Sequence, residues 1–179
     1  MSEQEIFEML AHKGEQQYGG EGVTQLEHAL QCAMLAEKAQ ANPALITACL
    51  FHDLGHLMHN LGENIAADGI DDRHEYRGLE ILSKLFLPQV TEPIRLHVEA
   101  KRYLCAVNTK YYETLSSASK KSLELQGGVF TLKQAEQFQQ SPYASDAIKL
   151  RIWDEQAKIP HLTTPSLYYF QPVILTCLN

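Results

Sequence analysis

The sequence lacks the features that define several large classes of protein. No apolar run approaches the ~20 residues that a membrane-spanning helix needs. Basic residues are too few for a general nucleic-acid surface, because 15 Lys and Arg stand against 22 Asp and Glu, a formal charge of −7. The first residues carry acids where a secretory signal would carry Lys or Arg. We therefore expect a cytoplasmic protein with neither a membrane nor a nucleic-acid partner.

Paired cysteines and strand patterns are missing as well. The four cysteines lie far apart and form no C-x-x-C pair, so we expect reduced thiols that are buried or half-buried. No two alternating β-branched runs are joined by a hairpin turn, and no internal repeat or linker is evident. With 179 residues, 45% of them hydrophobic, the chain can bury a proper core. These properties predict a single all-α domain over residues 1–179.

Helix-start signals recur along the whole chain. Three capping boxes predict helices that begin after Ser2, Thr24 and Thr131. Four more starts combine a capping residue with a proline near the first helical position: Asn42–Pro43, Thr91–Pro93, Ser141–Pro142 and Thr164–Pro165. The last two starts are Asp71–Asp72 and Ser116. The helix that starts at Asn42 is expected to continue through His56.

The most informative feature of the sequence is the dipeptide His52–Asp53 in LFHDLGH. A neutral imidazole and the adjacent carboxylate can hold one metal ion, while the second carboxylate oxygen holds another. Further donors fall on other predicted helices: His28, His74, His97 and Asp154. Six donors are too many for one catalytic metal that keeps open positions, so they favour two ions bridged by Asp53. The remaining histidines other than His56 are expected to be surface residues: His12, His59 and His161.

The donor types and their neighbours narrow the chemistry. Because the set contains no thiolate, it favours Fe, Mn or Zn, and the donors alone do not choose between these metals. His56 would lie one helical turn beyond His52, displaced along the axis, where it can touch a substrate. Lys101 follows His97 by four residues and Arg151 precedes Asp154 by three. Two such cations beside the metals form an anion clamp that suits phosphate-type oxygens.

The order H…HD…H…H…D resembles the HD-domain superfamily, most of whose members are metal-dependent phosphohydrolases. The additional pair, His74 and His97, resembles the branch with dinuclear, oxygen-using members. Six stretches between Tyr18 and Lys158 are similar to the HD-domain oxygenases of phosphonate catabolism: YGGEGVTQLEHALQCA, HDLGHL, GIDDRHE, LHVEAKRYLCAV, SLELQGG and LRIWDEQAK. The resemblance implies an HD-domain helical bundle. It also implies O2-dependent cleavage of the C–P bond of a 1-hydroxy-2-(trimethylammonio or amino)ethylphosphonate, which gives glycine betaine or glycine plus phosphate.

The resemblance further implies a mixed-valent Fe(II)/Fe(III) pair with O2 as co-substrate. One iron would be held by His28, His52, Asp53 and Asp154, and the other by Asp53, His74 and His97. Tyr18 would occupy an iron position until substrate arrives, and Glu21 would receive the amino end of the substrate. The substrate pocket would comprise His56, Lys101, Ser119, Gln126 and Arg151. The small phosphonate is the expected partner, and no protein partner is predicted.

Glu21 bears on the substrate, because glycines surround it and no structural partner is evident from the sequence. A carboxylate that faces the site favours a cationic substrate, and DDRHE and LHVEAKRYLCAV look slightly more like the trimethylammonio relative. Two alternatives stay open at this point. One is an HD phosphohydrolase that acts on a nucleotide or small phosphoester through a metal-bound hydroxide. The other is a metal-stabilised binding module without catalysis.

Overall fold

The computed structural model describes residues 2–58 and 69–179, and over these residues the chain is all-α. His59, which the sequence predicts to be a surface residue, lies outside the described residues. The elements are α1 (Glu3–Lys13), α2 (Gln25–Lys38), α3 (Pro43–Phe51), η1 (Leu54–Met58), α4 (His74–Leu82), α5 (Pro88–Val107), α6 (Thr109–Thr114), α7 (Ser117–Leu125), α8 (Leu132–Gln139), α9 (Ala144–Gln156), η2 (Leu167–Phe170) and α10 (Gln171–Leu175), where η marks a short 3₁₀ helix.

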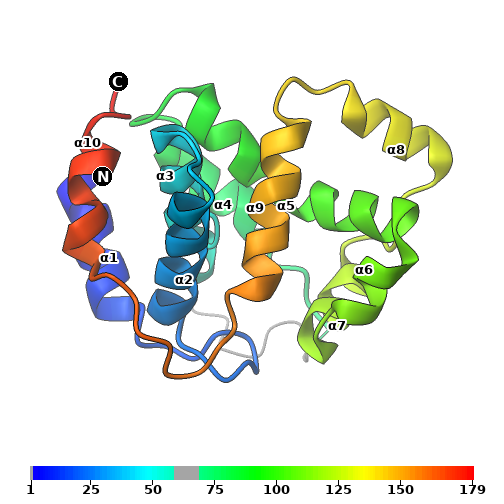
Figure 1. Ribbon diagram of the computed structural model, residues 1–179, viewed down its shortest axis with the longest axis horizontal. Helices are drawn as coiled ribbons and strands as arrows, with labels where there is room; N and C mark the ends of the chain where they lie inside the picture. The colour runs from blue at the N-terminus through cyan, green and yellow to red at the C-terminus, as the bar shows by residue number, and fades with distance from the viewer. Residues whose placement is uncertain (1, 59–68) are drawn as a thin grey trace.

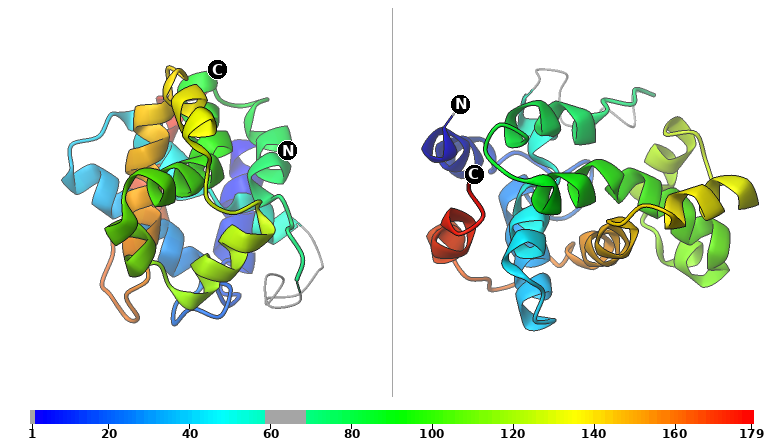
Figure 2. Two further views of the ribbon diagram at one scale, coloured as in Figure 1. Left: turned by 90° about the vertical axis from the view of Figure 1, so that its right-hand side faces the viewer. Right: turned by 90° about the horizontal axis from the view of Figure 1, so that it is seen from above.

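The helices are arranged around α2, α3, α5 and α9, which pack against one another in the middle of the molecule (Figure 1). Helices α1 and α10 lie together at one end, near both termini, whereas α6, α7 and α8 gather at the other end (Figure 2). Two apolar clusters follow this division. The larger one includes Phe7, Phe51 and Phe170, and the smaller one includes Leu123 and Phe138. The 20-residue helix α5 contributes to both clusters and so connects the two ends.

The predicted caps form where local sequence determines them. Ser2, Thr24 and Thr131 each complete a capping box, in which the side chain of the first residue and that of the third helical residue satisfy two backbone N–H groups. The side chain of Asn42 accepts a hydrogen bond from the backbone N–H of Leu45 at 2.9 Å. These interactions need no tertiary contact, which is why the sequence predicted them correctly.

Several predicted helix limits were wrong. Helix α3 ends at Phe51, so His52 is its C-terminal cap, and His56 lies in the separate 3₁₀ helix η1. The imidazole Nδ1 of His52 lies 2.9 Å from the carbonyl oxygen of Cys49, in the last turn of α3. His52 and His56 therefore do not share one helix face, because the backbone turns between them.

Other differences concern starts and short elements. Helix α5 begins at Pro88 and contains Pro93 in its interior, where the proline removes one helical hydrogen bond. Helix α9 begins at Ala144 rather than directly after Pro142, and the last predicted helix is a 3₁₀ turn followed by α10. The short helix α6, capped by the side chain of Asn108, was not predicted.

The compositional expectations were tested in part. All four cysteines are free, three of them buried and Cys177 half-buried, as predicted. In residues 2–58 and 69–179, no helix combines the length and the apolar character required to cross a bilayer. His12 and His161 are exposed, as expected. The cytoplasmic location and the extent of the domain over residues 1–179 stay predictions.

Candidate metal centre

Five segments that are distant in the sequence bring the predicted ligands together. His28 lies in the first turn of α2, His52 at the end of α3, His74 at the first position of α4, and His97 in the middle of α5. Asp154 lies in the last turn of α9. All six predicted ligands, including Asp53, are buried, with exposed fractions of 7% or less. These residues are therefore not scattered over the surface of the protein.

Hydrogen bonds determine which nitrogen of each imidazole faces inward. The Nδ1 atoms of His28, His52 and His97 donate to the carbonyl oxygens of their neighbours at 2.8, 2.9 and 2.6 Å. A carbonyl oxygen can only accept, so each neutral ring carries its proton on Nδ1 and keeps a lone pair on Nε2. The Nδ1 atom of His74 likewise lies 3.0 Å from Oδ1 of Asp72. All four Nε2 atoms are thereby presented as potential metal ligands.

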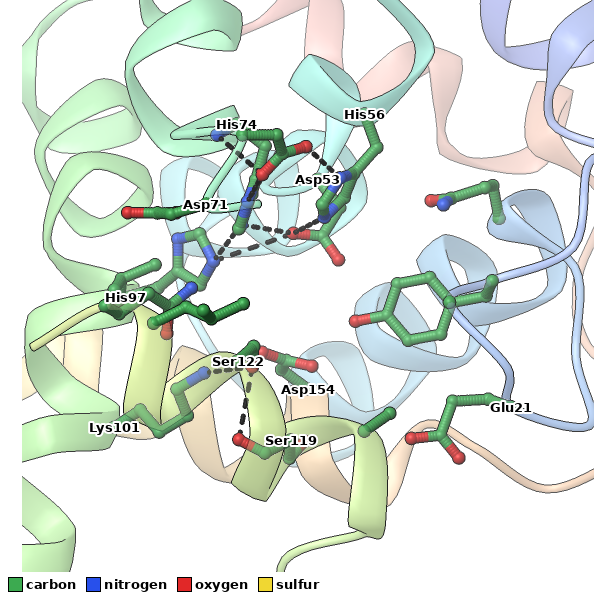
Figure 3. A pocket seen from close by; sticks show the side chains of 18 of the residues that line it. Glu21, Asp53, His56, Asp71, His74, His97, Lys101, Ser119, Ser122 and Asp154 are labelled. Carbon is green, nitrogen blue, oxygen red and sulfur yellow. Dashed lines mark hydrogen bonds and ion pairs between the residues drawn. The ribbon is translucent and has the colours of Figure 1, made fainter. Parts of the chain in front are cut away.

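Asp53 lies between two pairs of these imidazoles. Its Oδ2 atom is 3.6 Å from His28 Nε2 and 3.3 Å from His52 Nε2. Its Oδ1 atom is 3.2 Å from His74 Nε2 and 3.6 Å from His97 Nε2 (Figure 3). Each oxygen of the carboxylate thus faces a different pair. This is the arrangement that a carboxylate bridging two cations requires.

The contacts within the cluster fit a bound cation. The Nε2 atoms of His28 and His52 are 3.2 Å apart, and those of His74 and His97 are 3.1 Å apart, so each pair needs either a shared proton or a cation between its two nitrogens. Oδ2 of Asp53 and Oδ1 of Asp154 are buried and accept no hydrogen bond from the described residues. Such buried acceptors without donors are costly unless a positive charge lies among them.

The electrostatics of the cluster lead to the same conclusion. Burial by itself lowers the pKa of His52, but the adjacent Asp53 carboxylate outweighs this effect and raises that pKa to about 10. Burial opposes the ionisation of Asp53, yet His52 and His74 hold its pKa well below the usual range. Without a metal ion, the site thus retains a proton to supply positive charge. The residues present fit a cationic cofactor.

His56 and Asp72 extend the cluster toward solvent. The Nδ1 atom of His56 is 2.6 Å from Oδ2 of Asp72, while Oδ1 of the same carboxylate contacts His74. Asp72 therefore orients two imidazoles, a role that the sequence analysis missed, since it assigned Asp72 only to helix capping. The position of Asp72 two residues before His74 was the available signal. The Nε2 atom of His56 lies 3.9 Å from Asp53 Oδ1, so the spacing also allows His56 to be a ligand.

A pocket opens beside the cluster and contains the remaining predicted site residues. Four of the predicted ligands line it (Asp53, His74, His97 and Asp154), together with Tyr18, Glu21, His56, Lys101, Ser119, Gln126 and Arg151. Figure 3 shows Lys101 and Glu21 on different sides of this space, with Ser119 and Ser122 across from Asp53 and His97. The Oε1 atom of Gln126 is buried and has no hydrogen-bond partner among the described residues. The pocket thus gathers the predicted site residues except His28 and His52, which are fully buried beside Asp53.

The two predicted clamp cations differ in their surroundings. Lys101 is 3% exposed and donates from Nζ to Ser122 Oγ at 2.8 Å. Burial and then the Arg151 guanidinium lower the pKa of Lys101 to about 7. Arg151 is already engaged, because it donates to the carboxylates of Asp154 and Glu155 and to Tyr111 Oη. Arg151 can therefore orient Asp154 as well as attract an anion.

Tyr18 lies against the cluster of predicted ligands. Its ring stacks on that of His28, with 3.9 Å between centroids. Burial, followed by the Asp53 and Asp154 carboxylates, raises the pKa of its hydroxyl well above the usual value. Tyr18 therefore stands where it can cover one face of the site.

Glu21 differs from the sequence expectation that it lacks a structural partner. Its Oε1 atom accepts a hydrogen bond from Ser116 Oγ and lies 3.1 Å from Nζ of Lys158. The loop after α1 and the start of α7 meet here, and neither contact is visible from sequence spacing. Lys158 also lines the pocket, and the sequence analysis missed it. Because Glu21 and Lys158 are far apart in the chain, their spacing does not indicate an ion pair.

Comparison with known proteins agrees with the all-α fold. The HD domain family matches residues 26–149 of the chain. This range covers most of the cluster, including the His52–Asp53 dipeptide, and ends before Asp154. The ligand that α9 supplies thus comes from outside the matched segment.

Three relatives match nearly the whole chain. A hydroxymethylphosphonate dioxygenase of Gimesia maris is 44% identical over 177 residues, 97% of this chain and 87% of the relative. A glycine-betaine-forming [1-hydroxy-2-(trimethylamino)ethyl]phosphonate dioxygenase of Leisingera caerulea is 38% identical over 162 residues, 90% of this chain and 83% of the relative. An uncharacterised protein of Acanthamoeba polyphaga mimivirus is 30% identical over 176 residues, 97% of this chain and 80% of the relative.

Proposed function

Because this chain belongs to the HD-domain phosphonate dioxygenase family, we propose that it cleaves the C–P bond of a 1-hydroxyphosphonate in an O2-dependent reaction. The observation that carries the proposal is the convergence of four imidazole Nε2 atoms and two aspartates beside a pocket with buried cations. The reaction balances when both atoms of O2 enter the products. Hydroxymethylphosphonate would give formate and phosphate, and the trimethylammonio or amino substrate would give glycine betaine or glycine and phosphate.

The proposed cofactor is a pair of iron ions in the mixed-valent Fe(II)/Fe(III) state. His28, His52 and Asp154 would hold one ion, His74 and His97 the other, and Asp53 would bridge them. When bound, the pair supplies the redox chemistry for O2 and the positive charge that anchors substrate oxygens. The donor set, which contains nitrogen and oxygen but no thiolate, suits this metal.

The side chains around the pocket would bind and orient the substrate. Lys101 and Arg151 would neutralise the phosphonate, and Gln126 would donate a hydrogen bond to one of its oxygens. Ser119, whose hydroxyl donates to Glu155 Oε2 at 2.8 Å, would line the same side of the substrate pocket. Because Asp72 accepts from Nδ1 of His56, the Nε2 atom of that ring can accept the proton of the C1 hydroxyl. Charge neutralisation and positioning are the main contributions that the protein itself makes.

Tyr18 would protect the cluster between turnovers. Its ring lies on His28 at the border of the pocket, and burial together with the nearby Asp53 and Asp154 carboxylates raises the pKa of its hydroxyl. Substrate must displace this hydroxyl from the metal-facing space, as the resemblance to the family implies. Replacement of Tyr18 by Phe would then leave metal content intact and increase O2 consumption without substrate.

Metal analysis combined with O2-uptake and phosphate-release assays tests the proposed function. Protein produced in iron-sufficient cells should contain close to two Fe per chain and release one phosphate per O2 consumed from a 1-hydroxyphosphonate. Asp53→Ala serves as the inactive control, because it removes the bridging carboxylate. One Zn with no Fe, or phosphate release from phosphoesters without O2 uptake, would identify a phosphohydrolase instead. Absence of turnover with every substrate would leave a binding module.

A further inference from the structure

The pocket contains a second charged group that the metal chemistry does not use. We call it the lysine bridge, and it consists of Glu21, Glu155 and Lys158. The Nζ atom of Lys158 lies 3.1 Å from Glu21 Oε1 and 3.1 Å from Glu155 Oε1. It also donates to Ser119 Oγ at 2.9 Å and to Ser116 Oγ at 3.2 Å. The bridge thus connects the loop before α2, the start of α7 and the end of α9.

The surroundings of the lysine bridge strengthen its ion pairs. The side chains of Lys158 and Glu21 are 11% and 15% exposed, so water screens their attraction less than on an open surface. Ser116 Oγ donates to the same Glu21 oxygen that faces Lys158. The Glu21 carboxylate is therefore positioned by one hydroxyl and neutralised by one ammonium.

Lys158 already pairs with the Glu21 oxygen that a substrate cation would approach. Its Nζ atom is held there by Glu155 and by the hydroxyls of Ser116 and Ser119. Arg151 contacts Glu155 and Asp154 and is assigned to the phosphonate in the proposed function, so the neutralisation of Glu21 depends on Lys158. A substrate ammonium next to Glu21 would also lie next to the Lys158 ammonium.

We propose that Lys158 determines specificity by neutralising Glu21, so that the pocket favours a 1-hydroxyphosphonate without a cationic substituent. A trimethylammonio group has no N–H to replace the hydrogen bonds that Lys158 makes, and a primary ammonium must displace Lys158 first. A substrate with hydrogen at this position leaves the lysine bridge intact. The proposal rests on the proposed function, and it reverses the slight preference for the trimethylammonio substrate that the sequence resemblance indicated.

Paired binding and kinetic measurements test the role of Lys158. The holoenzyme is titrated without O2 with hydroxymethylphosphonate and with 1-hydroxy-2-(trimethylammonio)ethylphosphonate, and kcat/KM is measured with O2. The wild type should bind and turn over hydroxymethylphosphonate better. Lys158→Met should shift the ratio of the two Kd values toward the cationic substrate by about tenfold or more, since a partly buried like charge is removed.

Further variants separate specificity from structure. Lys158→Arg should keep the wild-type ratio, because the charge remains. Lys149→Met removes an exposed lysine from α9 and should change nothing. Addition of Glu21→Gln to Lys158→Met should abolish the gain for the cationic substrate. Lys158→Gln, which retains a donor for Glu21, replaces the Met variant if that variant unfolds.

Each outcome is decisive for Lys158. An unchanged Kd ratio in Lys158→Met and Lys158→Gln, equal loss of both ligands, or a wild-type preference for the cationic substrate would overturn the proposal. If neither phosphonate is turned over but the Kd ratio shifts as expected, the proposed function fails and the role of Lys158 stands.

Discussion

At the scale of single residues, proton positions on the imidazoles decide what the cluster can bind. Carbonyl oxygens hold the Nδ1 protons of His28, His52 and His97, and Asp72 holds that of His74. Their Nε2 lone pairs and the two Asp53 oxygens then point at two adjacent positions. His56 lies close enough to Asp53 to compete with His97 for the role of ligand. Replacing His56 and His97 one at a time shows which of the two is a metal ligand.

The metal content of variants should distinguish the bridging carboxylate Asp53, the ligand His97 and the substrate-contacting residue His56. We expect Asp53→Ala to lose both metals, because each of its oxygens faces one pair of imidazoles. His97→Ala should retain about one metal per chain, whereas His56→Ala should retain both and lose activity. Elemental analysis of purified variants measures this directly. Loss of a metal from His56→Ala, with both retained in His97→Ala, would exchange the two assignments.

Lys101 should give substrate binding a dependence on pH. Burial and the Arg151 guanidinium lower its pKa to about 7, so its positive charge is present below this pH and is lost above it. KM for the phosphonate should therefore rise between about pH 7 and pH 9. The Lys101→Met variant should have a higher KM at pH 6 and a flatter profile. A wild-type profile that matches that of Lys101→Met would exclude Lys101 from phosphonate binding.

At the scale of secondary structure, the second half of the cluster depends on the contact between η1 and α4. A Cβ atom on Gly55 would lie 2.0 Å from the carbonyl oxygen of His74 and 2.8 Å from its Cα. The absence of a side chain at Gly55 thus lets the start of α4 approach η1. Through this contact, His74 at the start of α4 lies close to Asp53, although the two residues are far apart in the sequence.

Gly55→Ala should therefore damage the metal site through the backbone. The methyl group would push α4 away from η1, with a loss of stability of about 1–3 kcal/mol, typical of overpacking. Metal content should fall toward one ion per chain as His74 moves. Gly78→Ala is the matched control, because its Cβ would lie 3.3 Å from Gly55 N at the same contact and needs only a small shift. Two metals retained in Gly55→Ala would show that α4 adapts.

At the scale of the whole molecule, the metal centre joins segments that are otherwise held by two separate apolar clusters. Helices α2 and α3 belong to the larger cluster, while the second half of α5 and the start of α9 belong to the smaller one. The ligands come from both regions, and their buried charges repel or remain unsatisfied without a cation. Metal binding and folding should therefore be thermodynamically linked.

Thermal unfolding measures this linkage. Metal at 1,000 times its Kd should stabilise the folded state by about 4 kcal/mol. In a domain of this size, that corresponds to a rise in Tm on the order of 10 °C. A chelator should reverse the rise in the wild type and have no effect on Asp53→Ala. An unchanged wild-type Tm after confirmed metal removal would mean that the cluster is rigid without its metals.

The sequence alone determined the helical content, most helix starts and the set of candidate metal donors. Capping boxes act between residues three positions apart, and donor chemistry belongs to the side chain itself, so neither depends on distant packing. The sequence did not determine the end of α3 after Phe51, the helix capped by Asn108, or the start of α5 at Pro88. Each of these depends on how one helix meets the next.

Tertiary structure alone decided which groups face one another across the pocket. Asp72 orients His56, which lies on a separate element, and Lys158 neutralises Glu21 although the two are far apart in the chain. A charged side chain that the sequence places near the site can therefore be neutralised by a residue that is distant in the sequence. The list of candidate donors therefore follows from the sequence, while the charge that remains available to a substrate follows from the packing of α7 and α9 around Glu21.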